Sequence, residues 1–104
     1  MKTLIIIPAY NEGENLERVI SDLRINYSQY DYIVVNDGSK DNTEDVCREC
    51  HFNFVSHPVN LGLAGAFQTG MRYAKYHGYD CAIQFDGDGQ HNAEYIEPMK
   101  ELMD

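Results

Sequence analysis

Apolar residues occur in this chain as two recurring patterns. Short continuous apolar runs, which are typical of strands buried on both faces of a sheet, occur four times. These runs are residues 4–7, 32–35, 52–56 and 81–85, and the third is the weakest. After the first run, which Pro8 is expected to end, Leu16, Val19, Ile20 and Leu23 repeat with the spacing of a helix that buries one face. The pattern predicts strands separated by amphipathic helices.

Three more helices are expected later in the chain. Asp41 and Glu44 have the D-x-x-E spacing of a capping box, which predicts a helix running to about Cys50. A stripe of small and apolar residues predicts a long helix, and its members are Leu63, Ala66, Phe67, Gly70, Met71 and Ala74. Asn92 is expected to cap a last helix, which would carry Ile96, Met99 and Met103.

This alternation predicts an α/β fold, a three-layer α/β/α arrangement around a mainly parallel sheet. Ligands of such sheets bind outside the carboxyl ends of the strands, where the strand order reverses. The polar segments that follow the strands are therefore expected at one edge, and they are residues 8–15, 36–42, 57–62 and 86–92. No further strand is predicted after residue 85, so the fourth strand is expected to keep an unpaired edge, and residues 1–104 are interpreted as a fragment.

The composition narrows the classes of function. Hydrophobic residues make up 43% of the chain, which is enough for a packed core. Eight Lys and Arg stand against 17 Asp and Glu, for a net charge of −9. A nucleic-acid partner is not expected, because binding phosphates directly requires a basic face. If the ligand carries phosphate, a divalent cation held by carboxylates is the natural counter-charge.

The cysteines and the apolar segments indicate a cytoplasmic protein. An odd number of cysteines (Cys47, Cys50 and Cys81) does not suggest a disulfide framework, and one C-x-x-C pair is too few ligands for a structural zinc site. Reduced thiols in a reducing compartment are therefore expected. There is no signal-peptide pattern, and no apolar stretch approaches the roughly 20 residues of a membrane span.

The strongest candidate for chemistry is the acidic segment after the fourth apolar run, Asp86, Gly87, Asp88, Gly89 and Gln90. Two carboxylates one residue apart can face the same cavity when the glycines let the backbone turn. Such hard oxygen ligands suit Mg²⁺ or Mn²⁺. An ordinary polar turn fits the same residues. An EF-hand does not, because His91 stands where that loop requires Gly.

Three other loops carry weaker candidates. Asp37, after the second run, can accept a hydrogen bond from a nucleobase N–H or a ribose hydroxyl. After the first run, Tyr10 can stack on a base and Glu12 can bind a hydroxyl or backbone group. Residues 60–65 open the long helix, where small residues and free N–H groups favour a phosphate. Plain turns, or close packing of the helix on the sheet, account equally well for each loop. His51, His57 and His77 lack metal-ligand spacing.

Taken together, the four loops resemble the family 2 glycosyltransferases of the GT-A fold. The matching pieces, in the order of that family, are Pro8-Ala9-Tyr10-Asn11-Glu12, Asn36-Asp37-Gly38-Ser39 with Asp41 and Thr43, Asn60-Leu61-Gly62, and Asp86-Gly87-Asp88-Gly89-Gln90-His91. The Asp-x-Asp followed by Gln-His resembles the branch with dolichyl-phosphate mannose synthase and polyprenyl-phosphate sugar transferases. Two departures are Asn36, where many members have Asp, and Asn92-Ala93, where a proline is frequent.

The resemblance implies that residues 1–104 form the Rossmann-like, nucleotide-sugar-binding half of a GT-A fold, with the acceptor half absent. It implies nucleotide contacts by Pro8, Ala9, Tyr10, Glu12, Asp37, Gly62, Asp86 and Gly87. It implies Mg²⁺ or Mn²⁺ contacts by Asp86 and Asp88, with Gln90 as a further ligand. Any general base is expected beyond residue 104, so this fragment alone is expected to be inactive.

The implied activity is metal-assisted transfer of a sugar, with inversion, from a nucleoside-diphosphate sugar to a glycan or a lipid phosphate such as a polyprenyl phosphate. Membrane association of the full-length protein, at the cytoplasmic face, is compatible with such an acceptor. Two other classes fit less well. A sugar nucleotidyltransferase should have a basic Gly-rich loop at residues 8–15, and a phospho-receiver module should have an acidic pair after the first strand; neither is present. G-x-G-x-x-G and P-loop motifs are also absent.

Overall fold

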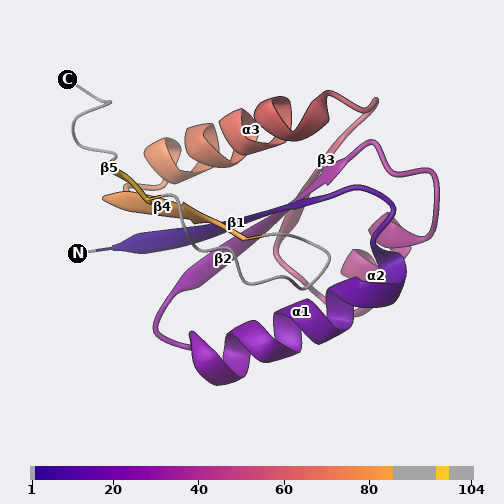
Figure 1. Ribbon diagram of the computed structural model, residues 1–104, viewed down its shortest axis with the longest axis horizontal. Helices are drawn as coiled ribbons and strands as arrows, with labels where there is room; N and C mark the ends of the chain where they lie inside the picture. Colours follow the sequence, from indigo (N-terminus) through magenta and orange to yellow (C-terminus); the bar gives the residue numbers. More distant parts are fainter. Residues whose placement is uncertain (1, 86–95, 99–104) are drawn as a thin grey trace.

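The computed structural model describes residues 2–85 and 96–98 of the chain. Its elements are β1 (Thr3–Ala9), α1 (Gly13–Asn26), β2 (Asp31–Asp37), α2 (Thr43–Glu49), β3 (Phe54–His57), α3 (Gly62–Tyr76), β4 (Cys81–Gln84) and β5 (Ile96–Pro98). Within this described part, the strands form one sheet in the order β3-β2-β1-β4-β5 (Figure 1). Strands β1 to β4 pair in parallel, and β5 pairs antiparallel with β4.

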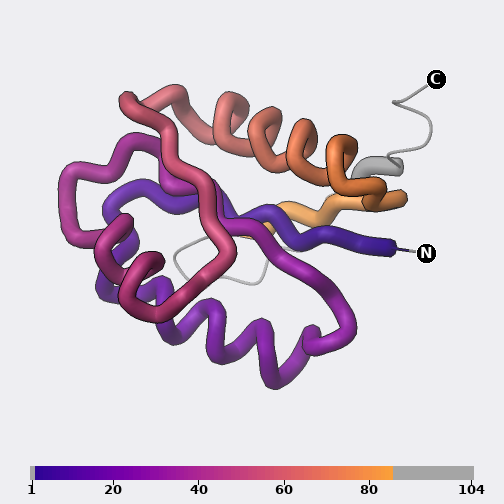
Figure 2. The backbone as a smooth tube through the Cα atoms, turned by 180° about the vertical axis from the view of Figure 1, so that it is seen from behind, coloured from indigo at the N-terminus to yellow at the C-terminus, as the bar shows by residue number. Residues whose placement is uncertain are grey.

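Helices cover both faces of the sheet, which confirms the three-layer α/β/α prediction. Helices α1 and α2 lie on one face and α3 lies on the other (Figures 1 and 2). Successive side chains of a strand point to opposite faces. Ile5 and Ile7 of β1 are therefore buried under α1 and α2, whereas Leu4 and Ile6 are buried under α3. A strand covered on both faces must be apolar throughout, which explains the continuous apolar runs.

Strand β1 continues past the point where Pro8 was expected to end it. Pro8 pairs with Val35 and Ala9 pairs with Asn36 of β2. The carbonyl of Ile6 accepts from the N–H of Phe85, so even-numbered residues of β1 bond toward β4. The ladder between β1 and β4 ends at the pair of Ile6 and Gln84. Pro8 is also even-numbered, so an N–H at this position would point toward β4, beyond the last pair of the β1–β4 ladder. Its absence therefore costs no hydrogen bond of that ladder, and the strand tolerates the proline.

The predicted last helix is wrong at Ile96, which belongs to β5. Ile96 pairs with Ile83 and Pro98 pairs with Cys81 in the antiparallel ladder, so the edge of β4 that was expected to be unpaired is paired with β5. A proline two residues after Ile96 disfavours a helix interior but is acceptable at the end of an edge strand. The other residues used for that prediction, Asn92, Met99 and Met103, lie outside the described residues.

The start of α2 also differs from the predicted capping box. The Asp41 carboxylate accepts from the N–H of Thr43, two residues on, at 2.9 Å. Glu44 instead forms an exposed ion pair with Arg48 at 3.1 Å. Strand β3 begins two residues later than expected, because Phe52 is still in the connection from α2, where its N–H donates to the carbonyl of Cys47.

Helix α3 lies very close to β1 because Gly70 faces the sheet. A Cβ on Gly70 would lie 2.4 Å from Cγ2 of Ile6, so only glycine fits at this distance. Ala66 and Ala74 are buried on the same face. Leu63, which was predicted to share this buried stripe, is 60% exposed, because it lies in the first turn of the helix at the edge of the sheet.

We expect Gly70→Ala to destabilise the protein by about 1–3 kcal/mol, the usual cost of forcing a methyl into a packed core. In an Ile6→Ala background the added methyl has room. Because Ala favours a helix over Gly by about 1 kcal/mol, the sign should then reverse. Urea unfolding of the four proteins in this double-mutant cycle measures the effect. Equal effects of Gly70→Ala in both backgrounds would contradict the close approach.

Candidate functional site

The polar loops that follow β1, β2 and β3 meet at one edge of the sheet, as the sequence predicted. Strands β2 and β3 extend to one side of β1 and β4 lies on the other, so the strand order reverses at β1. Open α/β sheets bind ligands at such a point. The chain leaves β4 at the same edge, where Phe85 bonds to Ile6. The fourth predicted loop, residues 86–92, lies outside the described residues.

A hollow of about 260 Å³ opens at this edge. It is lined by Pro8, Ala9, Tyr10, Asp37, Asn60, Gly62, Leu63 and Ala66. Five of these residues were predicted to bind a nucleotide, and they come from the end of β1 and the residue after it, the end of β2 and the start of α3. Tyr10 is 41% exposed and lines the hollow, so its ring can contact a ligand. Among the described residues, no Lys, Arg or His lines this hollow.

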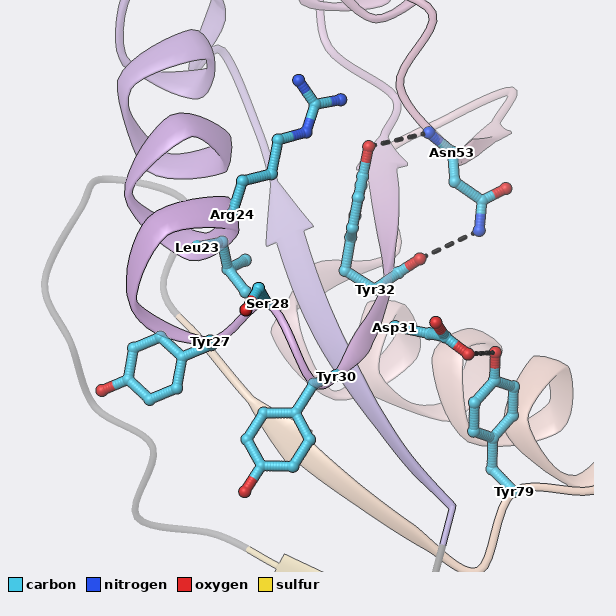
Figure 3. A pocket seen from close by; sticks show the side chains of 9 residues that line it. All are labelled: Leu23, Arg24, Tyr27, Ser28, Tyr30, Asp31, Tyr32, Asn53 and Tyr79. Carbon is cyan, nitrogen blue, oxygen red and sulfur yellow. Dashed lines mark hydrogen bonds between the residues drawn. The ribbon is translucent and has the colours of Figure 1, made fainter.

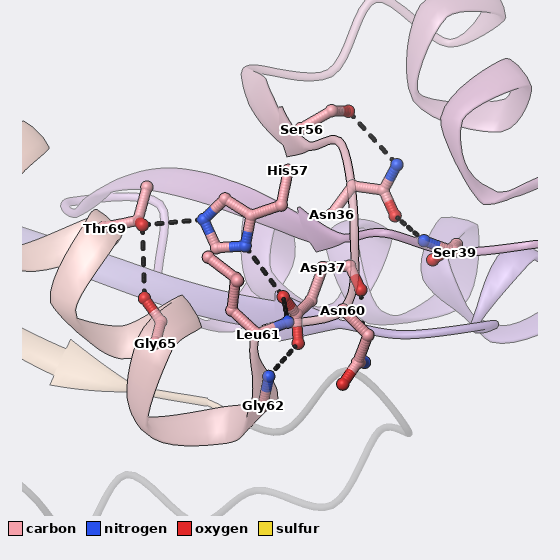
Figure 4. A network of polar contacts seen from close by, with 10 residues as sticks. All are labelled: Asn36, Asp37, Ser39, Ser56, His57, Asn60, Leu61, Gly62, Gly65 and Thr69. Atoms are coloured by element: carbon pink, nitrogen blue, oxygen red, sulfur yellow. Dashed lines mark hydrogen bonds and ion pairs between the residues drawn. The ribbon is translucent and has the colours of Figure 1, made fainter.

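Asp37 holds the loops around the hollow together. The residue is buried, with an exposure of only 4%. Oδ1 accepts from the N–H of Leu61 at 2.9 Å and lies 2.7 Å from Nδ1 of His57, while Oδ2 accepts from the N–H of Gly62 at 2.9 Å (Figure 4). Burial alone would raise the pKa of Asp37. The hydrogen bonds from His57, Leu61 and Gly62 outweigh it and hold the pKa below its ordinary value, so the carboxylate is charged at neutral pH.

This arrangement corrects one expectation for the start of α3. The N–H groups of Leu61 and Gly62 are not free for a phosphate, because both donate to Asp37. The carboxylate of Asp37 thus acts as a cap for α3 from a different loop. The close crossing also requires Gly38, whose φ is +68°, because a Cβ there would lie 2.3 Å from the backbone of Val59.

The loops after β1 and β2 are joined by a second set of contacts, which the sequence did not predict. Asn11 has a left-handed backbone with φ of 54°, and its Oδ1 accepts from the N–H of Lys40 at 2.8 Å. Its own N–H donates to Oγ of Ser39 at 3.0 Å. The N–H of Glu12 donates to Oγ1 of Thr43, also at 3.0 Å. Side chains of the second loop therefore satisfy backbone groups at the start of α1.

Asp41 adds a further contact between the two loops. The clasp, as we call this set, joins Asn11 to Ser39 and Lys40, Glu12 to Thr43, and Gly13 to Asp41. The Asp41 carboxylate accepts from the hydroxyl and N–H of Thr43 and from the N–H of Gly13 at 3.3 Å. Burial would raise the pKa of Asp41, but these hydrogen bonds outweigh it and lower the pKa. Polar residues in both loops were visible in the sequence. Their pairing was not, since it joins positions about thirty residues apart.

The remaining predicted site residues are not brought into the hollow by the described structure. The Glu12 carboxylate accepts from the side-chain amide of Asn15 at 3.1 Å, outside the lining of the hollow. Asp86, Gly87, Asp88 and Gln90 lie outside the described residues. Among residues 2–85 and 96–98, no group of three or more His, Cys, Asp or Glu is arranged to hold a metal ion.

A second hollow, of about 330 Å³, lies at the opposite, amino edge of the sheet. Figure 3 shows its lining, which includes four tyrosines and Arg24. Several of its polar groups already bind one another: the hydroxyl of Tyr79 donates to Asp31 at 2.7 Å, and the hydroxyl of Tyr32 accepts from the N–H of Asn53. It lies away from the switch point and the loops. The carboxyl edge is therefore the better candidate for the functional site.

The described cysteines are thiols, as expected, and Cys47 and Cys81 are buried. Burial raises the pKa of Cys47 to about 11, so this thiol is not a thiolate nucleophile at neutral pH.

No helix in the described part of the chain is long and apolar enough to cross a membrane.

We expect Asp37→Asn to lower the free energy of unfolding by about 2 kcal/mol at pH 7, because hydrogen bonds to a charged group contribute about 1.5–3 kcal/mol. The folded-state pKa of Asp37 lies below its ordinary value of 3.8. The contribution of the charge is therefore complete above that value and is lost as the pH falls through the folded-state pKa. Urea unfolding at pH 7, 5 and 3 should show the difference from wild type shrinking at pH 3. The exposed Asp45→Asn is the control, and an undiminished difference at pH 3 would contradict the assignment.

Known proteins are similar to this chain in sequence and in fold. The family model for glycosyl transferase family 2 matches residues 4–104. A UDP-N-acetylglucosamine–dolichyl-phosphate N-acetylglucosaminyltransferase from Methanococcus voltae is 34% identical, over 91% of this chain and 46% of the relative. An undecaprenyl-phosphate mannosyltransferase from Micrococcus luteus is 33% identical, over 99% of this chain and 44% of the relative. The chain thus spans less than half the length of these two relatives.

The fold is similar to that of a mannosyltransferase from Pyrobaculum calidifontis, solved in complex with GDP-Man and Mn²⁺. The TM-score is 0.72 at 25% identity, over 84% of this chain and 27% of that one. The match to the family model covers nearly the whole sequence, and the observed sheet order and layers agree with it. This chain belongs to glycosyltransferase family 2 and has the α/β/α architecture of the GT-A fold.

Proposed function

We propose that the complete protein transfers a sugar from a nucleoside-diphosphate sugar to an acceptor, with the hollow at the carboxyl edge holding the nucleotide of the donor. One observation carries this proposal. Three separate places in the chain, at the ends of β1 and β2 and the start of α3, bring Pro8, Ala9, Tyr10, Asp37 and Gly62 to the same hollow. These are positions at which the resemblance implies nucleotide contacts. Residues 1–104 would then be the donor-binding part of the protein.

The lining of the hollow suits a nucleoside. Tyr10 offers an exposed aromatic ring for stacking, and Leu63 and Ala66 offer apolar surface. In the described contacts, Oδ2 of Asp37 accepts one hydrogen bond, from Gly62. A carboxylate oxygen can accept a second, so Asp37 can also accept from a base N–H or a ribose hydroxyl.

The diphosphate of the donor requires positive charge that the described lining does not supply. Asp37 adds a negative charge to the hollow, and no Lys, Arg or His of the described part of the chain lines it. We therefore propose that Asp86, Asp88 and Gln90 hold Mg²⁺ or Mn²⁺ and that Gly87 contacts the nucleotide. Two carboxylates and an amide oxygen are suitable ligands for either ion. When bound, such an ion would stabilise the charge on the leaving diphosphate.

The acceptor is proposed from the relatives. The names of the relatives from M. voltae and M. luteus both specify a polyprenyl phosphate acceptor. A phosphate oxygen is already ionised at neutral pH and needs no general base, whereas the hydroxyl of a glycan acceptor would need one. A lipid phosphate acceptor is therefore the first choice. It would place the complete protein at the cytoplasmic face of a membrane.

Thermal unfolding with a panel of nucleoside diphosphates tests the donor site. UDP, GDP, CDP, dTDP and ADP are each added with and without Mn²⁺. A ligand at 100 times its dissociation constant stabilises the native state by about 2.7 kcal/mol. We expect a Mn²⁺-dependent rise in melting temperature with one base, lost in Asp86→Asn and in Asp88→Asn.

Asp45→Asn is the matched control, because it removes one exposed carboxylate, that of Asp45 in α2, by the same chemical change. It should keep the full ligand-dependent rise. If wild-type protein shows no rise with any nucleotide and Mn²⁺, the donor-site proposal is wrong. If the rise persists in both Asp86→Asn and Asp88→Asn, the metal assignment is wrong but the nucleotide hollow is not.

A further inference from the structure

His57 lies directly beside the carboxylate that organises the hollow. Strands β2 and β3 pair in parallel with Asp37 opposite His57, so the ladder itself places the two side chains together. Nδ1 of His57 is 2.7 Å from Oδ1 of Asp37, and Nε2 is 2.7 Å from Oγ1 of Thr69 in α3 (Figure 4). The His57 side chain is 9% exposed. It does not line the hollow.

The ionised carboxylate of Asp37 fixes the role of Nδ1. A carboxylate oxygen can only accept, so Nδ1 of His57, at 2.7 Å from Oδ1, carries a proton and donates it. On the other side of the ring, the hydroxyl of Thr69 has one proton, which it can donate either to the carbonyl of Gly65, at 3.1 Å, or to Nε2 of His57. The contact to Thr69 can therefore form in either direction while Nδ1–H donates to Asp37.

We propose that His57 is a positioning residue for the donor site: its Nδ1–H fixes the Asp37 carboxylate against the N–H groups of Leu61 and Gly62, and so sets the shape of the nucleotide hollow. The inference rests on the proposed function for what the hollow binds. The clamp, by which we mean the contact of His57 with the Asp37 carboxylate that also binds the N–H groups of Leu61 and Gly62, rests on the observed contacts and not on the proposed function. The lowered pKa of Asp37 agrees with it, because His57 is the first of the groups that outweigh the effect of burial.

The two ends of the imidazole have different tasks. Nδ1 acts on the carboxylate that lines the hollow, whereas Nε2 anchors the ring to Thr69 in α3. A residue that served only to fill space would act through its shape, not through one donor atom. Variants that keep one end and remove the other separate these roles.

Three variants make the test. The amide of Asn branches at Cγ as the imidazole does, so His57→Asn retains a donor near the position of Nδ1 and loses the contact to Thr69. The amide of Gln lies one bond further out, so His57→Gln reaches toward Thr69 and loses the donor to Asp37. Thr69→Val keeps the shape of Thr69 and removes its hydroxyl. Each is measured in the full chain, with urea unfolding as the stability reference.

Calorimetric titration with the preferred nucleoside diphosphate and Mn²⁺ is the first readout. We expect His57→Asn and Thr69→Val to stay within about threefold of wild-type affinity. His57→Gln should bind about tenfold more weakly, the factor that corresponds to losing one hydrogen bond to a charged group. Equal affinities of His57→Asn and His57→Gln would overturn the proposal, whether both are unchanged or both are weakened.

Amide hydrogen exchange of Leu61 and Gly62 in the ligand-free protein is the second readout. The exchange of both amides should accelerate in His57→Gln and stay slow in His57→Asn. This measurement separates the two proposals, since it needs no nucleotide. If wild-type protein binds no nucleotide but the exchange pattern holds, the proposed function fails and the clamp stands. If wild type binds nucleotide but both variants exchange alike, the clamp fails alone.

Discussion

A buried negative charge at the end of β2 determines how the loops of the carboxyl edge are arranged. An ionised carboxylate removed from water is costly unless hydrogen bonds compensate for it. Asp37 obtains them from His57, Leu61 and Gly62, all of which come after β2 in the chain. The connection from β3 to α3 must therefore cross the end of β2, and Gly38 leaves it the space to do so. The hydrogen bonds that compensate this one charge therefore determine the shape of the hollow.

The clasp between the first two loops adds a second constraint on the same edge. Asn11 and Asp41 bind backbone N–H groups of the opposite loop, and Thr43 accepts from Glu12. Together with Asp37, these contacts link the loops after β1, β2 and β3 into one unit. A site that is already fixed before its ligand arrives loses less conformational entropy on binding. The polar residues of these loops thus serve the shape of the site as well as contact with a ligand.

The sequence predicted the features that depend on local periodicity and missed those that depend on pairing between distant residues. The apolar run through Ile7 and the spacing of Leu16 and Ile20 determine β1 and α1 directly. The strand at Ile96 was missed because its pairing with β4 outweighs a weak helical spacing. Nothing near His57 in the sequence indicates its contact with Asp37, twenty residues earlier. Only the parallel register of β2 and β3 reveals it.

The same contacts bear on where a diphosphate could be held. Free N–H groups at the start of a helix are a common site for phosphate. At α3, however, the N–H groups of Leu61 and Gly62 are already bound to a carboxylate, and that negative charge would repel a phosphate placed there. The residues that the structure describes around the hollow also include no basic side chain. The described half of the edge therefore suits the neutral nucleoside better than the diphosphate. The charge of the diphosphate then has to be balanced outside this described lining, which agrees with the proposed cation at Asp86 and Asp88.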